Sequence, residues 1–204
     1  MPRKRKPGRP PKRPDSVSPK ERLLRSAREL FYQKGIATGV DELSAHAKVA
    51  KMSLYSHFGS KDNLATEYVV DADRGFQDWF EQQMALGPTE PKARLLHTFD
   101  VLIAWVTRAD FRGCIFINAA LQLNDCAHPA FSAAVAQKTS TRTRLEELAR
   151  AAGMRKPKAL ARELSLLMDG ALVAAAMEQS SAPAVAARSA AIKLVEASSE
   201  PPGA

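Results

Sequence analysis

The feature that most constrains this fold is a helical spacing of apolar residues that persists from Ser18 to about Ala197. Apolar side chains recur every three or four positions, and no segment shows the apolar and polar alternation typical of a strand. Proline and glycine interrupt the pattern where helices would begin and end. The sequence therefore predicts an all-α fold.

About nine helices follow from these signals. Ser18-Pro19-Lys20-Glu21 combines an N-cap serine, a proline at the first helical position and a glutamate three residues after the cap. Phe111 to Leu123 is the most uniformly apolar segment, and we expect it to be buried on all sides. The predicted helices cover residues 18–34, 40–47, 50–58, 61–86, 91–108, 111–123, 128–152, 157–179 and 183–197.

Positive charge is concentrated in the first third of the chain. The net charge is +8, yet residues 1–61 hold fifteen basic and five acidic residues, whereas residues 62–204 hold fifteen basic and seventeen acidic ones. Such asymmetry indicates a polyanion-binding region attached to a neutral or acidic remainder. Nucleic acid is the simplest partner for it.

Residues 1–14 contain seven Lys or Arg and no apolar residue after Met1, so we expect a disordered arm over residues 1–17. Its Gly8-Arg9-Pro10 centre resembles an AT-hook, in which an extended arm lays arginine in the narrow minor groove of A·T-rich DNA. Arg9 is therefore a candidate DNA contact. The other reading is a solvated charged tail. A second disordered tail is expected over residues 198–204.

Several classes of protein are excluded. Two cysteines without CxxC or Cys/His clusters predict neither a disulfide scaffold nor a metal site. The most apolar stretch, Leu164 to Met177, is interrupted by Asp169 and is shorter than the roughly 20 residues of a membrane span. No nucleophile elbow or phosphate loop is present, so we expect no catalytic residues and no cofactor. With no secretory signal, a cytoplasmic protein is expected.

Two short predicted helices in a basic region are typical of a helix-turn-helix DNA reader. Three segments carry a more specific pattern: Gly35 to Val40, Val49 to Phe58 with Leu-Tyr-x-x-Phe, and Ser60-Lys61-Asp62-Asn63-Leu64. Together they resemble the DNA-binding domain of the TetR family of bacterial transcriptional regulators. The resemblance implies a helix-turn-helix domain over residues 18–60 and a larger helical domain for effector binding and dimerisation over residues 61–197.

Three residues depart from the family pattern. Lys48 occupies the turn position that usually holds glycine, where a positive φ is costlier for a lysine. Ala50 replaces a serine cap, which is worth about 1 kcal/mol. Met52 replaces a small residue. These departures concern base reading rather than the fold.

The resemblance assigns backbone clamping to Thr38 and Lys61. On the recognition helix, Leu54 and Phe58 should face inward and the remaining side chains should face the major groove. Lys51 is the expected base reader, since lysine donates to guanine, while Tyr55 and His57 are expected to contact phosphate or, alternatively, to pack between helices. The turn residue Lys48 contacts phosphate or is solvated. The candidate DNA-binding residues are Arg9, Thr38, Lys48, Lys51, Met52, Ser53, Tyr55, His57 and Lys61.

One recognition helix reads too few base pairs to select a site, so we expect a homodimer on a palindromic double-stranded operator. Small residues in the last two helices are candidates for close pairing across a two-fold axis. The alternative is an ordinary core within one chain. These residues are Gly170, Ala171, Ala174, Ala175, Ala176, Ala184, Ala186, Ala187, Ala190 and Ala191.

Aromatic residues of the middle helices predict a site for a small apolar or aromatic effector, although such a stripe is more often plain core. The candidates are Trp79, Phe80, Phe99, Trp105, Phe116, Asn118 and Gln122, with Phe111, Phe131, His97 and His128 as further possibilities. Cys114, and less so Cys126, is a candidate oxidant-sensing thiol, with Arg112 as a group that lowers its pKa, or else a buried apolar residue.

The sequence thus predicts a sequence-specific, cytoplasmic, nucleoid-associated transcriptional regulator, most simply a homodimeric repressor that an effector releases from its operator. The alternatives are an architectural DNA binder of the nucleoid, suggested by the arm, and a thiol-based regulator that senses oxidants or electrophiles.

Overall fold

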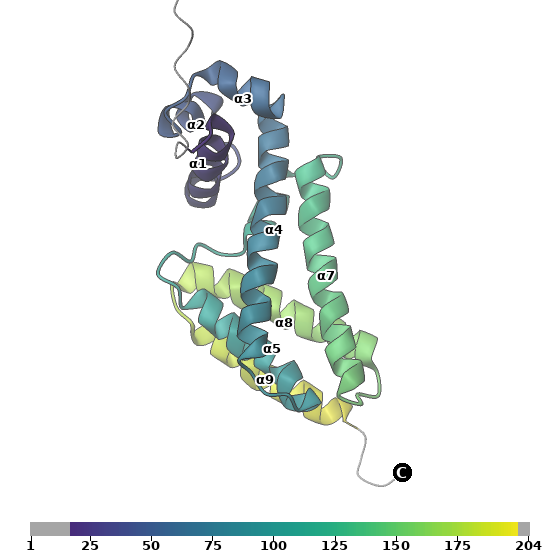
Figure 1. The fold of residues 1–204 in the computed structure, drawn as a ribbon. Coiled ribbons are helices and arrows are strands. Elements are labelled where there is room, and N and C mark those ends of the chain that lie inside the picture. Colours follow the sequence, from purple (N-terminus) through teal and green to yellow (C-terminus); the bar gives the residue numbers. More distant parts are fainter. Residues whose placement is uncertain (1–16, 200–204) are drawn as a thin grey trace, which may run out of the picture.

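The computed structural model describes residues 17–199, and this part of the chain is entirely α-helical (Figure 1). The predicted fold class is confirmed. The nine helices of the described residues are α1 (Pro19–Lys34), α2 (Val40–His46), α3 (Lys51–Phe58), α4 (Lys61–Ala85), α5 (Pro91–Val106), α6 (Ile115–Leu123), α7 (Pro129–Ala151), α8 (Pro157–Glu178) and α9 (Ala182–Ser198).

Local sequence signals set the first helix. The Ser18 hydroxyl accepts from the Glu21 amide at 3.2 Å, and the Glu21 carboxylate accepts from the Ser18 amide at 2.8 Å, which confirms the predicted capping box. Gly35 ends α1 with φ 95°, a conformation that favours glycine. A Cβ atom there would also lie 2.7 Å from Gln122 Oε1, so this glycine serves both the turn and a close approach.

We term residues 17–60 the head and residues 61–199 the body. In the head, α1, α2 and α3 surround Leu23, Leu43 and Leu54, none of which has solvent-exposed surface. The 25-residue α4 then runs from the head along the length of the body (Figure 1). The buried residues of the head join the core of the body, and the head is continuous with the longest helix of the body.

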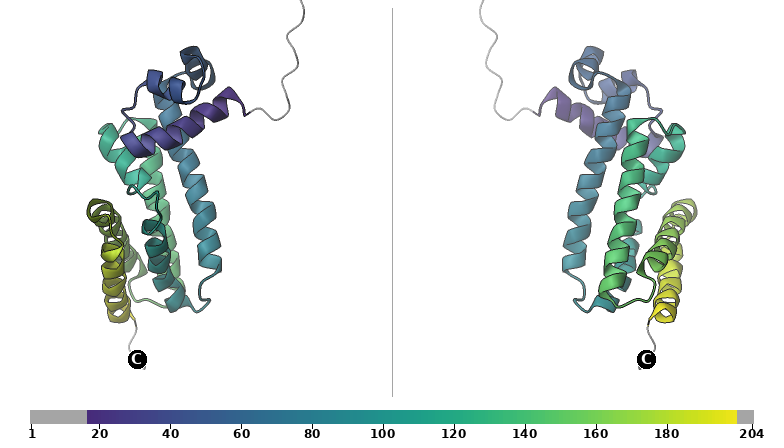
Figure 2. Two further views of the ribbon diagram at one scale, coloured as in Figure 1. Left: turned by 90° about the vertical axis from the view of Figure 1, so that its left-hand side faces the viewer. Right: turned by 90° about the vertical axis from the view of Figure 1, so that its right-hand side faces the viewer.

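The body is layered. Helices α4 and α7 lie side by side, and both begin near the head (Figure 1). Helices α8 and α9 form an outer layer on the side away from α4, with α5 and α7 between (Figure 2). No helix within residues 17–199 is long and apolar enough to cross a membrane.

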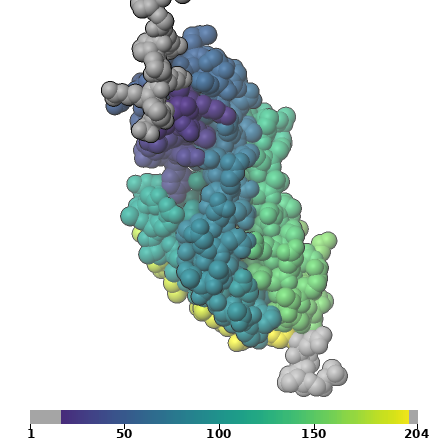
Figure 3. Space-filling model, in the orientation of Figure 1, coloured from purple at the N-terminus to yellow at the C-terminus, as the bar shows by residue number. Residues whose placement is uncertain are grey.

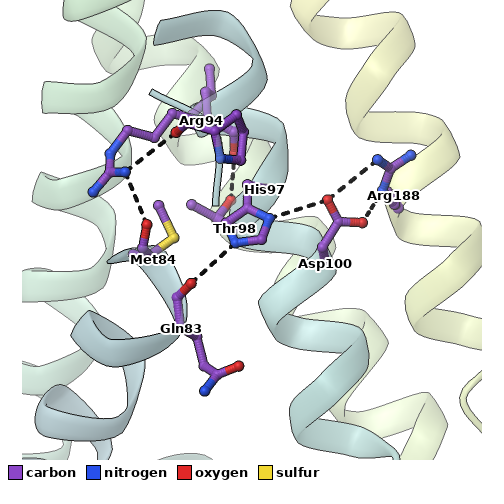
Figure 4. A network of polar contacts seen from close by, with 9 residues as sticks. Gln83, Met84, Arg94, His97, Thr98, Asp100 and Arg188 are labelled. Atoms are coloured by element: carbon purple, nitrogen blue, oxygen red, sulfur yellow. Dashed lines mark hydrogen bonds and ion pairs between the residues drawn. The ribbon is translucent and has the colours of Figure 1, made fainter. Parts of the chain in front are cut away.

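A polar network fixes α9 against the interior of the body (Figure 4). Arg188 on α9 donates to both oxygens of Asp100 on α5, at 2.5 and 3.3 Å. His97 lies 3.5 Å from the same carboxylate through Nδ1, and its Nε2 lies 3.3 Å from the Gln83 carbonyl oxygen on α4. His97 is thus a link between helices.

Two details differ from the sequence-based expectation. Helix α6 begins at Ile115 rather than at Phe111, because Gly113 adopts φ 95° and Cys114 is the extended N-cap. The expectation that this helix is buried on all sides is wrong, since Leu121 is 74% exposed.

Lys48 does adopt the glycine-favoured conformation, with φ 54°, and Ala50 provides no side-chain cap.

Two predictions fall wholly or partly outside the described residues. The AT-hook-like arm with Arg9 lies before residue 17. Of the predicted tail, Ser198 is instead the last residue of α9, and residues 200–204 lie outside the described part.

Candidate nucleic-acid interface and body cavity

The recognition helix α3 presents most of its predicted DNA contacts to solvent. Leu54 is fully buried and Phe58 nearly so, as expected from the helical pattern. On the other side, Met52 is 71% exposed and Tyr55 is 41% exposed. Lys51 and His57 are also exposed, and Ser53 is half-buried. The described residues therefore provide a continuous outward face on α3 of the size and polarity that a DNA groove accommodates.

Lys51, the candidate base reader, forms an ion pair within the head. Its Nζ lies 2.8 Å from Oδ1 of Asp41 in the first turn of α2. The Asp41 carboxylate accepts this hydrogen bond and raises the pKa of Lys51 above its ordinary value. Both side chains are exposed, and exposed ion pairs hold their partners weakly. Lys51 is therefore charged and easily redirected to another acceptor.

Thr38 and Lys61 hold the loop between α1 and α2. Thr38 is only 8% exposed, and its hydroxyl donates to the Gly35 carbonyl at 2.7 Å. The Lys61 ammonium donates to the Ile36 carbonyl at 3.0 Å. An ammonium group has three N–H donors. Lys61 thus has two donors beyond this contact, whereas the Thr38 hydroxyl is already used as a donor.

The turn residue Lys48 is exposed, and its backbone is held by the first helix. Arg22 Nη1 donates to the Lys48 carbonyl at 3.2 Å, which secures the strained turn against α1. The lysine side chain is left at the surface beside the start of α3. This contact between residues 26 positions apart was not apparent from the sequence.

The body contains an aromatic cavity of about 90 Å³ between α4, α5, α6, α7 and α8. Of the predicted effector residues, Trp79, Phe80, Trp105 and Phe116 line it. The centroids of the Trp79 and Trp105 rings are 4.8 Å apart. Phe76, which the sequence analysis did not single out, packs edge-on against Trp105 at 5.4 Å and lines the same cavity.

The other predicted effector residues lie elsewhere. Phe99 is fully buried in the core, and the Asn118 amide donates to the Arg112 carbonyl at 3.2 Å. The side chain of Gln122 accepts from the Ile36 amide of the head at 2.8 Å. The predicted residues that do not line the cavity are Phe99, Asn118 and Gln122, together with His97, Phe111, His128 and Phe131.

Cys114 lines the cavity but lacks the properties of a reactive thiol. Its side chain is buried, and burial raises the pKa of the thiol above its ordinary value despite the nearby Lys138. The expectation that Arg112 lowers this pKa is wrong. A sensor cysteine needs a thiolate that solvent can reach. Cys126 is exposed, and both cysteines are free.

Two cations at the cavity are paired, and one buried polar atom is not. Lys138 forms an ion pair with Asp169, and Arg144 forms one with Glu81 while its guanidinium lies 5.1 Å from the Phe80 ring centroid. Gln137 is 3% exposed, and its side-chain oxygen has no hydrogen-bond partner. Sequence reasoning missed Gln137 because its polar neighbours on α7 resemble a solvated helix face.

Helix α6 is tied to the head at both of its ends. The Tyr32 hydroxyl on α1 donates to the Gly113 carbonyl at 3.2 Å and accepts from the Arg112 amide at 2.7 Å. Gln122, in the last turn of α6, binds the Ile36 amide. Figure 3 shows the purple α1 lying close above the teal surface of this region. The helix that borders the cavity thus also contacts the head.

The outer layer of α8 and α9 carries an exposed apolar face. Ala171, Ala175, Ala184, Ala187 and Ala191 were predicted to pair across two chains, but they are buried within this one. Gly170 and Ala186 remain exposed, and Ala174, Ala176 and Ala190 are half-buried. Larger apolar side chains that the sequence analysis did not single out are exposed on the same layer: Leu166, Val173, Met177 and Val185.

Within residues 17–199, no group of three or more His, Cys, Asp or Glu is arranged to hold a metal ion.

Comparisons with known proteins match this arrangement. Residues 23–68 match the family described as "Bacterial regulatory proteins, tetR family". The transcriptional regulator AcuR of Cereibacter sphaeroides is 27% identical over 187 residues, covering 87% of this chain and 85% of that protein. A TetR-family transcriptional regulator of Streptomyces coelicolor is 28% identical, with a TM-score of 0.81 and coverage of 89% of this chain and 96% of that one. A TetR-type regulator of Streptomyces avermitilis is 29% identical, with a TM-score of 0.80. The match covers 89% of this chain and 98% of that one.

Proposed function

Because the chain belongs to the TetR family of bacterial transcriptional regulators, which bind DNA and are not enzymes, we propose that it is a homodimeric repressor released from its operator by a small molecule. Residues 18–60 are the DNA-binding domain in this proposal, and residues 61–197 bind the effector and form the dimer. The protein acts in the bacterial cytoplasm, on the DNA of the nucleoid.

The observation that carries the proposal is the double attachment of α6. Its N-cap and first turn, Cys114 to Phe116, border the aromatic cavity. Its two ends contact the head through Tyr32 and Gln122. A ligand that displaces α6 therefore changes the position of the head. An effector that binds better when the spacing of the two heads does not match the half-sites of the operator shifts the population toward that state. It thereby lowers the affinity for DNA.

In the DNA complex, α3 lies in the major groove. Lys51 leaves Asp41 and donates to guanine, and Met52 and Ser53 contact neighbouring base edges. Phosphates are bound by the remaining candidates. These are Thr38, Lys48, Tyr55, His57 and Lys61, and Thr38 needs its backbone or a reoriented hydroxyl for this role because its side chain is engaged with Gly35.

The exposed apolar face of α8 and α9 supports the homodimer. Two heads related by a two-fold axis read half-sites roughly 34 Å or a multiple of that distance apart. Met177 is 80% exposed on this face. We expect Met177→Asp to convert the dimer into a folded monomer in sedimentation velocity, with Gln82→Asp on the exposed side of α4 as a control. A persistent dimer would contradict this interface.

The arm adds non-specific affinity in this proposal, with Arg9 in the minor groove. The seven Lys or Arg of each arm would release counterions on binding, so deleting residues 1–14 from both protomers flattens the dependence of log affinity on log salt by up to about twelve, or about six for each arm. Equal slopes with and without the arm would show that it does not bind DNA.

The raised pKa of the buried Cys114 speaks against the thiol-sensor alternative. A raised pKa leaves less thiolate at neutral pH, so alkylation of Cys114 accelerates only as pH rises above the ordinary range of a cysteine. We expect iodoacetamide to modify Cys126 quickly and Cys114 slowly at pH 7, as followed by mass spectrometry. Rapid labelling of Cys114 would favour the sensor.

The experiment that tests the regulator proposal is a fluorescence-anisotropy titration of the protein with its own upstream DNA and with a scrambled duplex of the same length. We expect a preference of at least about a thousandfold for the upstream DNA, the ratio typical of specific binding. Equal affinities would favour the architectural alternative.

A further inference from the structure

Gln137 is one of the residues that line the aromatic cavity, and one polar atom of its side chain is unpaired. The residue lies on α7 and is 3% exposed. Its Nε2 donates to the Thr141 hydroxyl at 3.1 Å, which fixes the amide, while Oε1 has no hydrogen-bond partner. A buried amide oxygen without a donor is unfavourable, and such groups are rare in folded proteins. The cavity is therefore prepared for a molecule that brings a donor.

Several other polar groups at the cavity already have a partner. The Thr98 hydroxyl donates to the Leu95 carbonyl at 2.7 Å, and the Gln77 amide donates to Asp73 at 3.2 Å. The two cations of the lining are paired with acids, Lys138 with Asp169 and Arg144 with Glu81. A carboxylate ligand would have to share Lys138 or Arg144 with Asp169 or Glu81, whose negative charge repels it. An uncharged ligand leaves both intact.

The walls define the shape and size of the ligand. Phe76, Trp79, Trp105 and Phe116 present aromatic faces and edges, with Phe76 and Phe116 centroids 6.3 Å apart in an edge-to-face arrangement. Planar aromatic molecules extend such packing favourably. The cavity volume of about 90 Å³ is below the roughly 150 Å³ of an engineered cavity that binds benzene in another protein. A single ring would therefore already require the side chains of the walls to move apart, and we take about one ring as the upper limit for the ligand.

We propose that the effector is an uncharged planar molecule of about one-ring size whose hydrogen-bond donor, such as a phenolic O–H, binds Gln137 Oε1. Gln137 is then the residue that determines specificity, and the aromatic walls supply affinity without discrimination between polar and apolar rings. This inference rests on the proposed function, in which the cavity is the effector site.

The test uses the full-length protein and three probes of similar size. Phenol carries the donor, toluene replaces its hydroxyl by a methyl group, and benzoate carries a negative charge. Calorimetry measures the dissociation constants. Both tryptophans of the chain line the cavity, so their fluorescence reports whether binding occurs there. We expect phenol to bind about tenfold tighter than toluene, the value of one buried hydrogen bond, and benzoate to bind more weakly still. Equal or tighter binding of toluene or benzoate would overturn the proposal.

Gln137→Leu removes the acceptor and keeps a side chain of similar length. We expect it to abolish the preference for phenol over toluene while leaving toluene affinity within about twofold. Gln77→Leu is the matched control, because Gln77 lines the same cavity but its amide is engaged with Asp73; it should keep the preference. An unchanged preference in Gln137→Leu would contradict the assigned contact. If that variant fails to fold, the three probes on the natural chain still decide.

Failure of this inference is separable from failure of the proposed function. Anisotropy of the upstream DNA complex is measured with and without saturating phenol. Binding of phenol without release of DNA would support the ligand class and contradict induction. Absence of binding by all three probes, together with intact specific DNA binding, would overturn the ligand class and leave the regulator proposal standing.

Discussion

The head and the body place their candidate binding groups in opposite environments. In the head, Lys51, Met52 and Tyr55 project from a short helix into solvent. In the body, Trp79, Trp105 and Gln137 surround a cavity between several helices. DNA is larger than the domain that reads it and needs an exposed face, whereas a small ligand gains affinity only where it is enclosed. The candidate site of the head therefore consists of side chains that face solvent. The candidate site of the body consists of side chains from several helices that surround one cavity.

This difference predicts that the two regions respond differently to loss of a core residue. Leu54→Ala removes a fully buried side chain from the head, which costs about 2–5 kcal/mol. Leu54 lies on the side of the shared core that α1 to α3 cover, so we expect these helices to unfold while the body stays folded. Hydrogen exchange would then show lost protection in residues 19–58 and retained protection in α8. Met52→Ala, on the exposed side of α3, should change stability by less than about 0.5 kcal/mol. Simultaneous loss of protection in both regions would contradict this local unfolding.

The exposed face of α3 is tested by removing its base reader. Lys51→Ala should weaken binding to the upstream DNA by about 1–3 kcal/mol, or about five- to 150-fold, while helical content is unchanged. Tyr55→Ala is expected to lose a phosphate contact. It should therefore weaken binding to the upstream DNA and to the scrambled duplex by similar factors. Lys193→Ala on α9 removes an exposed cation far from the head and serves as the control. Unchanged affinity in both head variants would contradict the assignment of α3.

The helical pattern of the sequence was sufficient to predict the helices of the head and their buried positions. The capping signal at Ser18 and the inward positions of Leu54 and Phe58 depend on neighbours within a few residues, and the structure agrees with each. The same reasoning accounts for most helix boundaries. It placed the start of α6 too early, because Gly113 and Cys114 lie within an apolar run that hides the turn.

Prediction of the residues around the body cavity would have required knowing which helices pack against one another. Trp79 and Trp105 were predicted for the effector site and line the cavity, whereas Phe99, predicted on the same grounds, lies in the core. Gln122 was assigned to the effector and instead binds Ile36, 86 positions away. Helical spacing identifies the buried face of each helix and contains no information on its neighbour. Contacts between distant residues, such as that of Gln122, are therefore missed.

Tyr32 tests whether the head and the body communicate. Tyr32→Phe keeps the ring and removes the hydroxyl that bridges Gly113 and Arg112, so the head loses one tie to α6. We expect the effect of saturating phenol on operator affinity to shrink by about three- to tenfold, with phenol affinity itself little changed. Gln122→Ala should act in the same direction, and Gln82→Ala on exposed α4 should not. A full response in both tie variants would contradict coupling through α6.

The smallest expected effect concerns the ion pair that holds Lys51 before DNA arrives. Asp41→Asn removes the partner of Lys51 and also one negative charge near the phosphates, so either effect raises affinity, by about twofold for an exposed pair. The two effects separate in a double-mutant cycle. If Asp41 competes with guanine for the lysine, the gain from Asp41→Asn disappears in the Lys51→Ala background. A gain of equal size in both backgrounds would show that Asp41 only repels phosphate, and that Lys51 is free to read the base without giving up a partner.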